Sequence, residues 1–245
     1  MNLGSGVHLI GSGRLGISLT HPLDCNAYAV RCGEQYWLID AGVGRQTELL
    51  LTQLREDGVP NEAIGGLLLT HYHLDHSGGA RWLHENLGLT VAAGGITAAV
   101  LAAGDEEAIS LGAAKRAGVY PDDFAFQACP VSRILADGEE WKIGDATIRA
   151  IATPGHSRDM MSFLIRRDGC AMLFTGDTLF HGGLIALQAT HDCDPPAYAA
   201  SLRRLAALEF DMMFPGHGLW SLTEAHRHAD TAMKFVDRLL LPPSL

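Results

Sequence analysis

The sequence predicts an α/β fold in which helices cover the outer faces of β-sheets. Short apolar segments rich in β-branched and aromatic residues are followed by helical segments, and this succession occurs twice along the chain. The chain has 245 residues, 47% of them hydrophobic, which suits one large core. No repeat of fixed period and no low-complexity linker is visible, so we expect a single domain over residues 1–245.

The first part of the chain predicts strands followed by helices. Three short segments bounded by Gly or Asp predict strands at 7–10, 26–32 and 36–42. The apolar spacing of residues 45–56 predicts a helix that ends before Gly58. Residues 65–70 predict a buried strand, and Ser77 is expected to cap a helix that runs to about Leu87.

Residues 87–104 carry no charge, and their number reaches the lower limit for a membrane span. The pair Gly94-Gly95 interrupts this segment. We therefore predict a short buried strand at 89–93, a turn, and an Ala-rich helix from Gly95 to about Ala117. Residues 121–130 predict a loop.

The second part of the chain predicts two hairpins, a helix, a strand and a final helix. The hairpins span 139–156 and 162–177 and turn at Gly144-Asp145 and Asp168-Gly169. A helix with Pro at its start covers 195–208. A last strand begins at Asp211, and the chain closes on a helix from about Ser221 to Leu240.

Charge and cysteine content restrict the partners and the compartment. The net charge is −10 with no Lys/Arg cluster, which disfavours a nucleic acid or an anionic membrane as partner. Five cysteines without a C-x-x-C pair disfavour a disulfide framework, and the first residues do not resemble a secretory signal, so we expect a cytoplasmic protein. The oligomeric state stays open between monomer and homodimer, since the final "LLLPPSL" packs on this chain or on a second copy.

The segment "GSGRLG", Gly11 to Gly16, matches the dinucleotide motif G-x-G-x-x-G. That motif requires a helix to open directly after it, but Pro22 and a segment without helical period follow. We predict a turn here rather than a nucleotide site.

Residue types that bind metals follow several of the predicted strands, each on a loop that contains glycine. The candidates are His71, His73, Asp75, His76, His156, Asp177 and His217. Because strand ends meet at one edge of a sheet, we expect these five histidines and two aspartates to converge. Their number exceeds the four ligands of one tetrahedral zinc and suits two divalent metal ions that share a bridging carboxylate. The donor mixture favours Zn, with Fe or Mn as alternatives.

Alternation within a loop predicts how this set divides. Residues at i and i+2 point the same way, so His71 and His73 grip one ion while Asp75 and His76 turn toward the second. Three further histidines, His84, His226 and His228, fall on predicted helices, where we expect them to be solvated.

Other polar side chains near the strand ends are candidates for supporting roles. Thr70 and Asp40 are placed to orient histidine N–H groups, with a simple turn as the alternative for Asp40. Three residues that follow Asp177 are candidates for the substrate pocket: Phe180, His181 and Gln188. For His181 a position in a surface loop is the alternative.

The segments "THYHLDHSGG", "TPGHS", "FTGDTLF" and "FPGHG", in this order, resemble the metallo-β-lactamase fold superfamily over nearly the whole chain. The resemblance implies a four-layered αββα sandwich with the metals between the inner sheet edges. It also implies a division of the ligands: His71, His73 and His156 on metal one, Asp75, His76 and His217 on metal two, and Asp177 bridging.

Such a pair of cations, about 3.5–4 Å apart, binds one water between them and makes hydroxide available at neutral pH. That hydroxide attacks a carbonyl carbon without a serine nucleophile, and no G-x-S-x-G is present. The resemblance implies that Asp75 orients the hydroxide or shuttles its proton. We therefore predict hydrolysis of an ester, thioester or lactone of a small molecule, with Asp75 and Asp177 as the catalytic carboxylates.

Within the superfamily, "GDTLF" most resembles hydroxyacylglutathione hydrolase, a thioesterase, although "HGGLIALQ" stands where that enzyme has "GCGR". Lactonases of quorum signals resemble the chain in size and ligands, but they place a Tyr where Phe180 stands. The alternative from another class is a persulfide dioxygenase with one iron on the counterparts of His71, His156 and Asp177. Metal content separates these classes.

Overall fold

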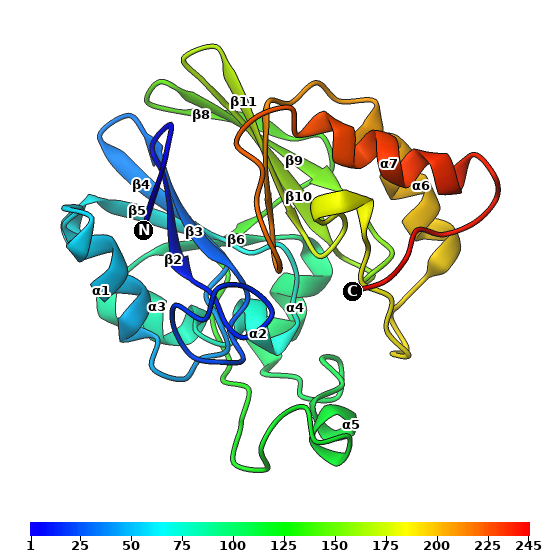
Figure 1. Ribbon diagram of the computed structural model, residues 1–245. Coiled ribbons are helices and arrows are strands. Elements are labelled where there is room, and N and C mark those ends of the chain that lie inside the picture. The colour runs from blue at the N-terminus through cyan, green and yellow to red at the C-terminus, as the bar shows by residue number, and fades with distance from the viewer. The chain divides into compact units, whose positions relative to one another are not determined.

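The computed structural model describes all 245 residues (Figure 1). The chain divides into two compact units, residues 1–134 and 135–245, which are described in turn. The expectation of one domain over 1–245 stays a prediction.

The first unit contains a seven-stranded sheet whose spatial order follows the chain. Its strands are β1 (Asn2–Gly4), β2 (Val7–Gly11), β3 (Ala27–Cys32), β4 (Gln35–Ile39), β5 (Ile64–Leu68), β6 (Thr90–Ala93) and β7 (Arg133–Ile134). Strands β1 to β4 pair antiparallel, whereas β4 to β7 pair parallel. The carboxyl ends of β4, β5 and β6 therefore meet at one edge, where the segment after β5 carries the first group of candidate ligands.

Three helices of this unit contact its sheet: α1 (Glu48–Glu56), α3 (Ala80–Leu87) and α4 (Gly95–Ala103). The unit also contains the 3₁₀ turn η1 (Asn61–Ala63), the short helix α2 (Leu74–Ser77) and α5 (Leu111–Arg116), which lies away from the sheet (Figure 1). The core joins Leu50 and Leu54 of α1 and Leu83 of α3 to Leu38 and Leu67 of the strands. All five side chains are at most 1% exposed. Because side chains alternate along a strand, each strand supplies only every second residue to this layer.

Most elements predicted for the first unit are confirmed, with two corrections. The helix expected over 95–117 is two helices, because Gly104 adopts a left-handed conformation (φ 61°) that ends α4. Ser77 does not cap the following helix, since it ends α2 and its hydroxyl donates to the carbonyl of Tyr72. The "GSGRLG" segment forms a turn after β2, as predicted. No helix of the chain combines the length and the apolar character that a membrane crossing needs.

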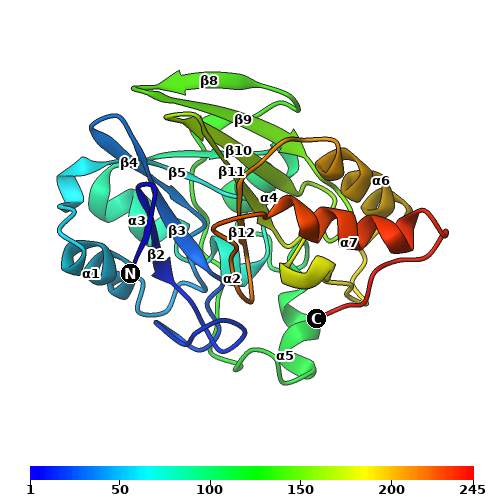
Figure 2. The same cartoon turned by 45° about the horizontal axis from the view of Figure 1, so that its top comes forward.

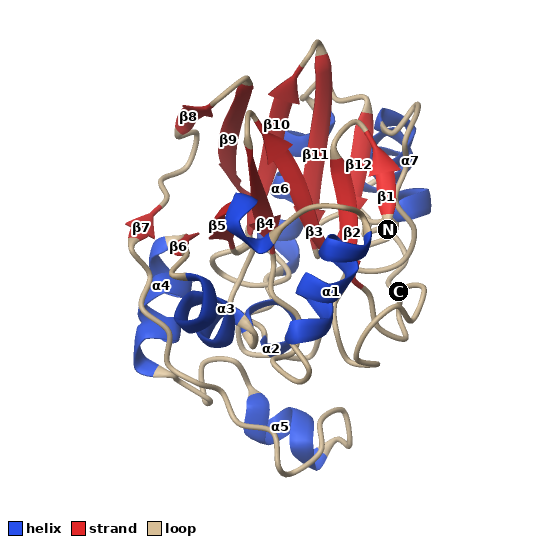
Figure 3. Ribbon diagram, turned by 90° about the vertical axis from the view of Figure 1, so that its left-hand side faces the viewer, coloured by secondary structure: helices blue, strands red, loops and turns tan.

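The second unit contains a five-stranded sheet in the order β12-β11-β10-β9-β8, whose strands are labelled in Figure 3. Its strands are β8 (Glu140–Ile143), β9 (Ala146–Ala152), β10 (Met161–Arg167), β11 (Cys170–Gly176) and β12 (Met212–Pro215). The two predicted hairpins are confirmed as β8-β9 and β10-β11. Strand β12 lies parallel to β11, so the ends of β11 and β12 are neighbours.

Two helices, α6 (Pro195–Ala206) and α7 (His226–Val236), lie side by side in this unit (Figure 2). Leu202 of α6 and Ala232 of α7 share a core with Leu164 and Leu173 of the sheet. Helix α7 is shorter than predicted because Ser221 instead pairs with Met213 in a β-bridge. The short η2 turn (His181–Gly183) follows β11.

The last residues pack on the second unit of the same chain. Ile185 donates its N–H to the carbonyl of Pro243 and accepts from the N–H of Leu245 at 2.9 Å. The two sheets, each with helices against it, confirm the predicted α/β class.

Candidate metal centre

The first group of candidate ligands lies where β5 ends. His71 and His73 occupy the segment after β5, while Asp75 and His76 lie on the short helix α2 rather than in the expected loop. The N–H of Ala41, after β4, donates to the carbonyl of His76 at 2.7 Å and ties α2 to the neighbouring strand end. The fold thus holds these residues through both parallel strands.

The three imidazoles of this segment cluster in the interior. The ring centroids of His71 and His73 are 4.6 Å apart, and those of His71 and His76 are 4.2 Å apart. His71 and His76 are fully buried and His73 is 7% exposed. Buried imidazoles at this spacing need polar or cationic partners.

Asp40 and Thr70 orient two of these rings, as predicted. Asp40 Oδ2 accepts from His76 Nδ1 at 2.8 Å, and Thr70 donates both its N–H and its hydroxyl to the Asp40 carboxylate. Since the Thr70 hydroxyl donates to Asp40, it accepts from His71 Nδ1 at 3.0 Å. Both histidines then carry their proton on Nδ1 and keep the lone pair on Nε2.

Two contacts of this group had no signal in the sequence. Cys25 is fully buried beside His76 and Asp40, and burial raises the pKa of its thiol to about 12, so it remains protonated. The Tyr120 hydroxyl donates to Asp75 Oδ1 at 3.2 Å from 45 residues away. Burial and the neighbouring Asp75 carboxylate raise the pKa of Tyr120 well above 10, so the phenol acts as a donor.

The second group lies at the ends of three strands of the second unit. His156 follows β9, Asp177 follows β11 directly, and His217 lies two residues beyond β12. Asp177 Oδ2 is 3.5 Å from His156 Nε2 and 3.4 Å from His217 Nε2. One carboxylate therefore faces two imidazole nitrogens, and all three side chains are buried.

Tyr198 of α6 connects two members of this group. Its hydroxyl donates to the carbonyl of Asp177 and accepts from the N–H of Ala186 at 3.1 Å. The carbonyl of Ala186 accepts from His156 Nδ1 at 2.8 Å, which leaves the lone pair on Nε2. Gly155 permits this arrangement, because its φ is +147° and a Cβ there would lie 2.5 Å from Tyr198 Cα.

The three pocket candidates lie in different surroundings. Phe180 is 1% exposed and its ring lies nearly parallel to that of His217, with centroids 6.3 Å apart. His181 is half-buried on η2, and its ring centroid is 4.4 Å from that of His228. Gln188 is exposed in the segment between η2 and α6. Of the three, Phe180 is in contact with a candidate ligand.

His228 corrects the expectation of a solvated residue, since it is 3% exposed, whereas His84 and His226 are half-buried. Its Nδ1 accepts from the N–H of Gly182 at 3.0 Å, which a protonated ring cannot do. Burial, the facing His181 and the charge of Arg227 lower the pKa of His228 to about 4.

This shift predicts a pH-dependent stability. The unfolded histidine titrates near 6.5, so between pH 6.5 and about 4 the unfolded chain binds more protons than the folded one. We expect stability to decrease as the pH falls through this window, measured as the thermal unfolding midpoint. His228→Asn keeps an acceptor for Gly182 without titrating, so it should flatten this slope. The control His226→Asn, on the same helix, should keep it, and equal slopes in wild type and His228→Asn contradict the assignment.

The donor chemistry of both groups fits a divalent cation. His71, His76 and His156 are each held by Nδ1 and direct an Nε2 lone pair away from that hydrogen bond. His76 Nε2 is 3.6 Å from Asp75 Oδ2, so a lone pair faces an anionic oxygen there, as it does between His156 and Asp177. A cation between such atoms satisfies both. These histidines and aspartates are therefore able to bind metal.

The chain is similar to known proteins in both sequence and fold. The family model described as "Metallo-beta-lactamase superfamily" matches residues 21–217. The chain is 30% identical over 194 residues to "Atrochrysone carboxyl ACP thioesterase" of Aspergillus fumigatus, covering 79% of this chain and 50% of that protein. It is 34% identical over 197 residues to "Thioesterase pkgB" of Emericella nidulans, covering 79% and 45%. The chain thus spans about half the length of these relatives.

Solved structures share the fold. The subclass B3 metallo-β-lactamase BJP-1 of Bradyrhizobium japonicum superposes with a TM-score of 0.72 at 21% identity, covering 98% of this chain and 91% of that one. A metallo-β-lactamase of Cronobacter sakazakii superposes with a TM-score of 0.70 at 23% identity, covering 89% and 80%. At these identities the likeness concerns the fold alone.

Proposed function

The chain belongs to the metallo-β-lactamase superfamily, and we propose that it is a metal-dependent hydrolase that cleaves a thioester or ester bond of a small molecule. The observation that carries this proposal is the paired presentation of imidazole Nε2 atoms and carboxylate oxygens in both groups of candidate ligands. The names of the thioesterase relatives support the thioester as the first choice of bond.

The proposed ligand set uses both groups and is that of two divalent ions. His71, His73 and His156 would hold one ion, Asp75, His76 and His217 would hold the other, and Asp177 would be the ligand that both share. We expect zinc first, because zinc in proteins is usually bound by imidazole, carboxylate or thiolate groups, and the first two are present here. When bound, the two ions supply a water of lowered pKa and polarise the carbonyl group of the substrate.

The protein side chains supply orientation and proton transfer. Asp40 and Thr70 hold two imidazoles in the tautomer that ligation needs. Asp75 accepts the proton of the attacking water on its carboxylate, which the Tyr120 hydroxyl keeps in place through Oδ1. Phe180 covers one side of His217 with an apolar ring and keeps bulk water from it.

The test combines metal analysis with a substrate panel. Purified protein is expected to contain two divalent ions per chain and to hydrolyse thioesters or aryl esters within a panel that also includes lactones. Chelation should abolish turnover, and added Zn²⁺, Mn²⁺ or Fe²⁺ should restore it. One iron per chain with oxygen uptake on a persulfide would instead establish the dioxygenase alternative. A metal-loaded protein without turnover on any carbonyl substrate would contradict the proposal.

A further inference from the structure

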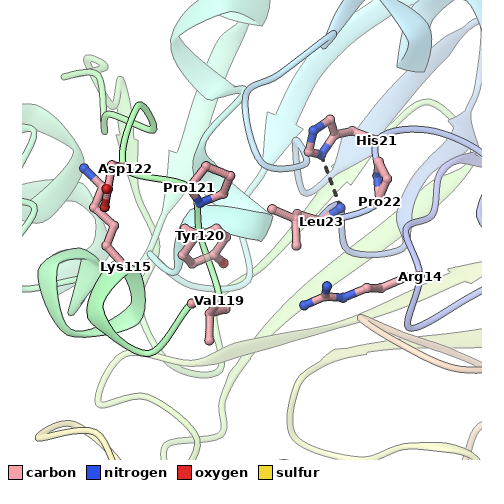
Figure 4. Close-up of a pocket in the computed structure, with 10 residues that line it drawn as sticks. Arg14, His21, Pro22, Leu23, Lys115, Val119, Tyr120, Pro121 and Asp122 are labelled. Carbon is pink, nitrogen blue, oxygen red and sulfur yellow. Dashed lines mark hydrogen bonds between the residues drawn. The ribbon is translucent and has the colours of Figure 1, made fainter.

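The first unit contains a cavity of about 510 Å³ that is widely open to solvent and has a mainly apolar lining (Figure 4). One wall is the loop after β2, which contributes Arg14, His21 and Leu23, and the other is the segment after α5, which contributes Val119 and Tyr120. Cavities of this size and composition accommodate small organic groups.

Tyr120 links this cavity to the candidate metal centre. Its ring lines the cavity, and its hydroxyl donates to Asp75, to which we assign the proton transfer. Its ring also packs on Phe124 with centroids 5.7 Å apart, which fixes its orientation. A group bound against Tyr120 is therefore one side chain away from a proposed catalytic carboxylate.

Hydrogen bonds hold the loop after β2, which forms the wall that contains Arg14, in place. Asp24, 5% exposed, accepts from the Thr20 hydroxyl at 2.6 Å and from the N–H groups of His21 and Val43. The N–H of Arg14 donates to the carbonyl of Pro22 at 2.8 Å. The wall is thus pre-formed, which lowers the entropic cost of binding a ligand.

The charge of the cavity contrasts with that of the whole chain. The chain has 28 acidic and 18 basic residues, yet Arg14 and Lys115 both line the cavity and Asp122 is the only acid there. Neither cation forms an ion pair with another side chain. Figure 4 shows the Arg14 side chain extending from its loop toward Tyr120. Arg14 is exposed, and its guanidinium beside an apolar surface favours a ligand with an apolar body and an anionic group.

We infer that this cavity is a substrate subsite that selects an apolar group bearing a carboxylate or phosphate, with Arg14 as the residue that binds the anion. This inference deepens the proposed function and rests on it. The anion comes either from the acyl half of the thioester, as a second carboxylate, or from its thiol half, as a phosphate. Lys115 adds to the positive potential, and Leu23, Val119 and Tyr120 contact the apolar body.

The kinetic test compares matched substrates on the metal-loaded enzyme. One pair is the N-acetylcysteamine thioester of phenylacetic acid and its 4-carboxy derivative, and the other is phenylacetyl pantetheine and phenylacetyl 4′-phosphopantetheine. In one pair the anionic member should have the higher kcat/KM. Arg14→Gln should reduce the ratio of its kcat/KM to that of the neutral member about tenfold, mainly by raising the KM of the anionic member. The control Arg116→Gln, an exposed residue of α5 outside the cavity lining, should keep the wild-type ratio. The pair that responds identifies the half that enters the cavity, and unchanged ratios in both pairs overturn the inference.

A binding measurement separates this inference from the proposed function. Calorimetry with phenylacetamide, 4-carboxyphenylacetamide, pantetheine and 4′-phosphopantetheine needs no turnover. Tighter binding of an anionic member that Arg14→Gln weakens supports the subsite even where every carbonyl substrate fails. The inference of a subsite is overturned, even where thioesters are hydrolysed, by either of two results. One is equal affinity for the neutral and the anionic compound both among the two amides and among the two pantetheines. The other is an affinity for the anionic compound that Arg14→Gln leaves unchanged.

Discussion

Asp177→Ala is expected to lower hydrolysis by about 10³-fold and to reduce the bound metal from two ions per chain to at most one. Asp177 is 3% exposed, and its Oδ2 lies 3.5 Å from His156 Nε2 and 3.4 Å from His217 Nε2. Alanine removes the carboxylate that faces both rings.

Metal content by elemental analysis and turnover of the best thioester or ester in the panel check this prediction together. The matched control is Asp237→Ala, an exposed aspartate at the end of α7 with no side-chain hydrogen bond, which should keep both the metal and the activity. A fully active Asp177→Ala enzyme with two ions per chain would exclude the bridging role.

Asp40→Asn is expected to weaken metal affinity by about 10–100-fold while the fold is retained. The carboxylate accepts from His76 Nδ1 and from both the N–H and the hydroxyl of Thr70. Asp40 also has a positive φ of 61°, which asparagine adopts as readily as aspartate, so the change removes the charge without straining the backbone. An uncharged amide polarises the imidazole of His76 less and presents an N–H where Thr70 or His76 needs an acceptor.

Asp40→Ala is expected to be more severe, because it leaves the buried donors of His76 and Thr70 without their acceptor and places alanine at a positive φ. The expected loss of stability is about 2–4 kcal/mol. Metal titration and denaturant unfolding measure the two effects separately. Asp24→Asn provides the control, since Asp24 is also a buried acceptor in the first unit but has no bond to a candidate ligand. Metal affinity that falls equally in both asparagine variants would show a general effect of unfolding rather than orientation of His76.

Strands and hairpins were predictable because they depend on local patterns. Two short apolar runs on either side of the Asp168-Gly169 turn identify β10 and β11 without reference to the rest of the chain. Helix boundaries were less predictable, because the break at Gly104 depends on the backbone conformation of one residue within an Ala-rich segment. Strands β1 and β7 escaped prediction because they have only three and two residues.

In the candidate site, too, some features were predictable from the sequence and others were not. The histidines and aspartates that follow strands are recognisable, because a strand end fixes where the next residues lie. The surroundings of those residues are not recognisable, because they come from distant segments. The burial of His228, the position of Cys25 and the contact of Phe180 with His217 are examples.

The amino-acid order by itself determined the fold class, the family and the metal-binding character of the chain, because periodicity and motif spacing are properties of neighbouring residues. Only the tertiary structure decided which groups hold those donors and what lies beside them. The Asp40 carboxylate beneath His76 and the Tyr120 hydroxyl on Asp75 join residues 36 and 45 positions apart. The cavity around Arg14 likewise exists only because two separate loops pack against each other, and no local pattern encodes that packing.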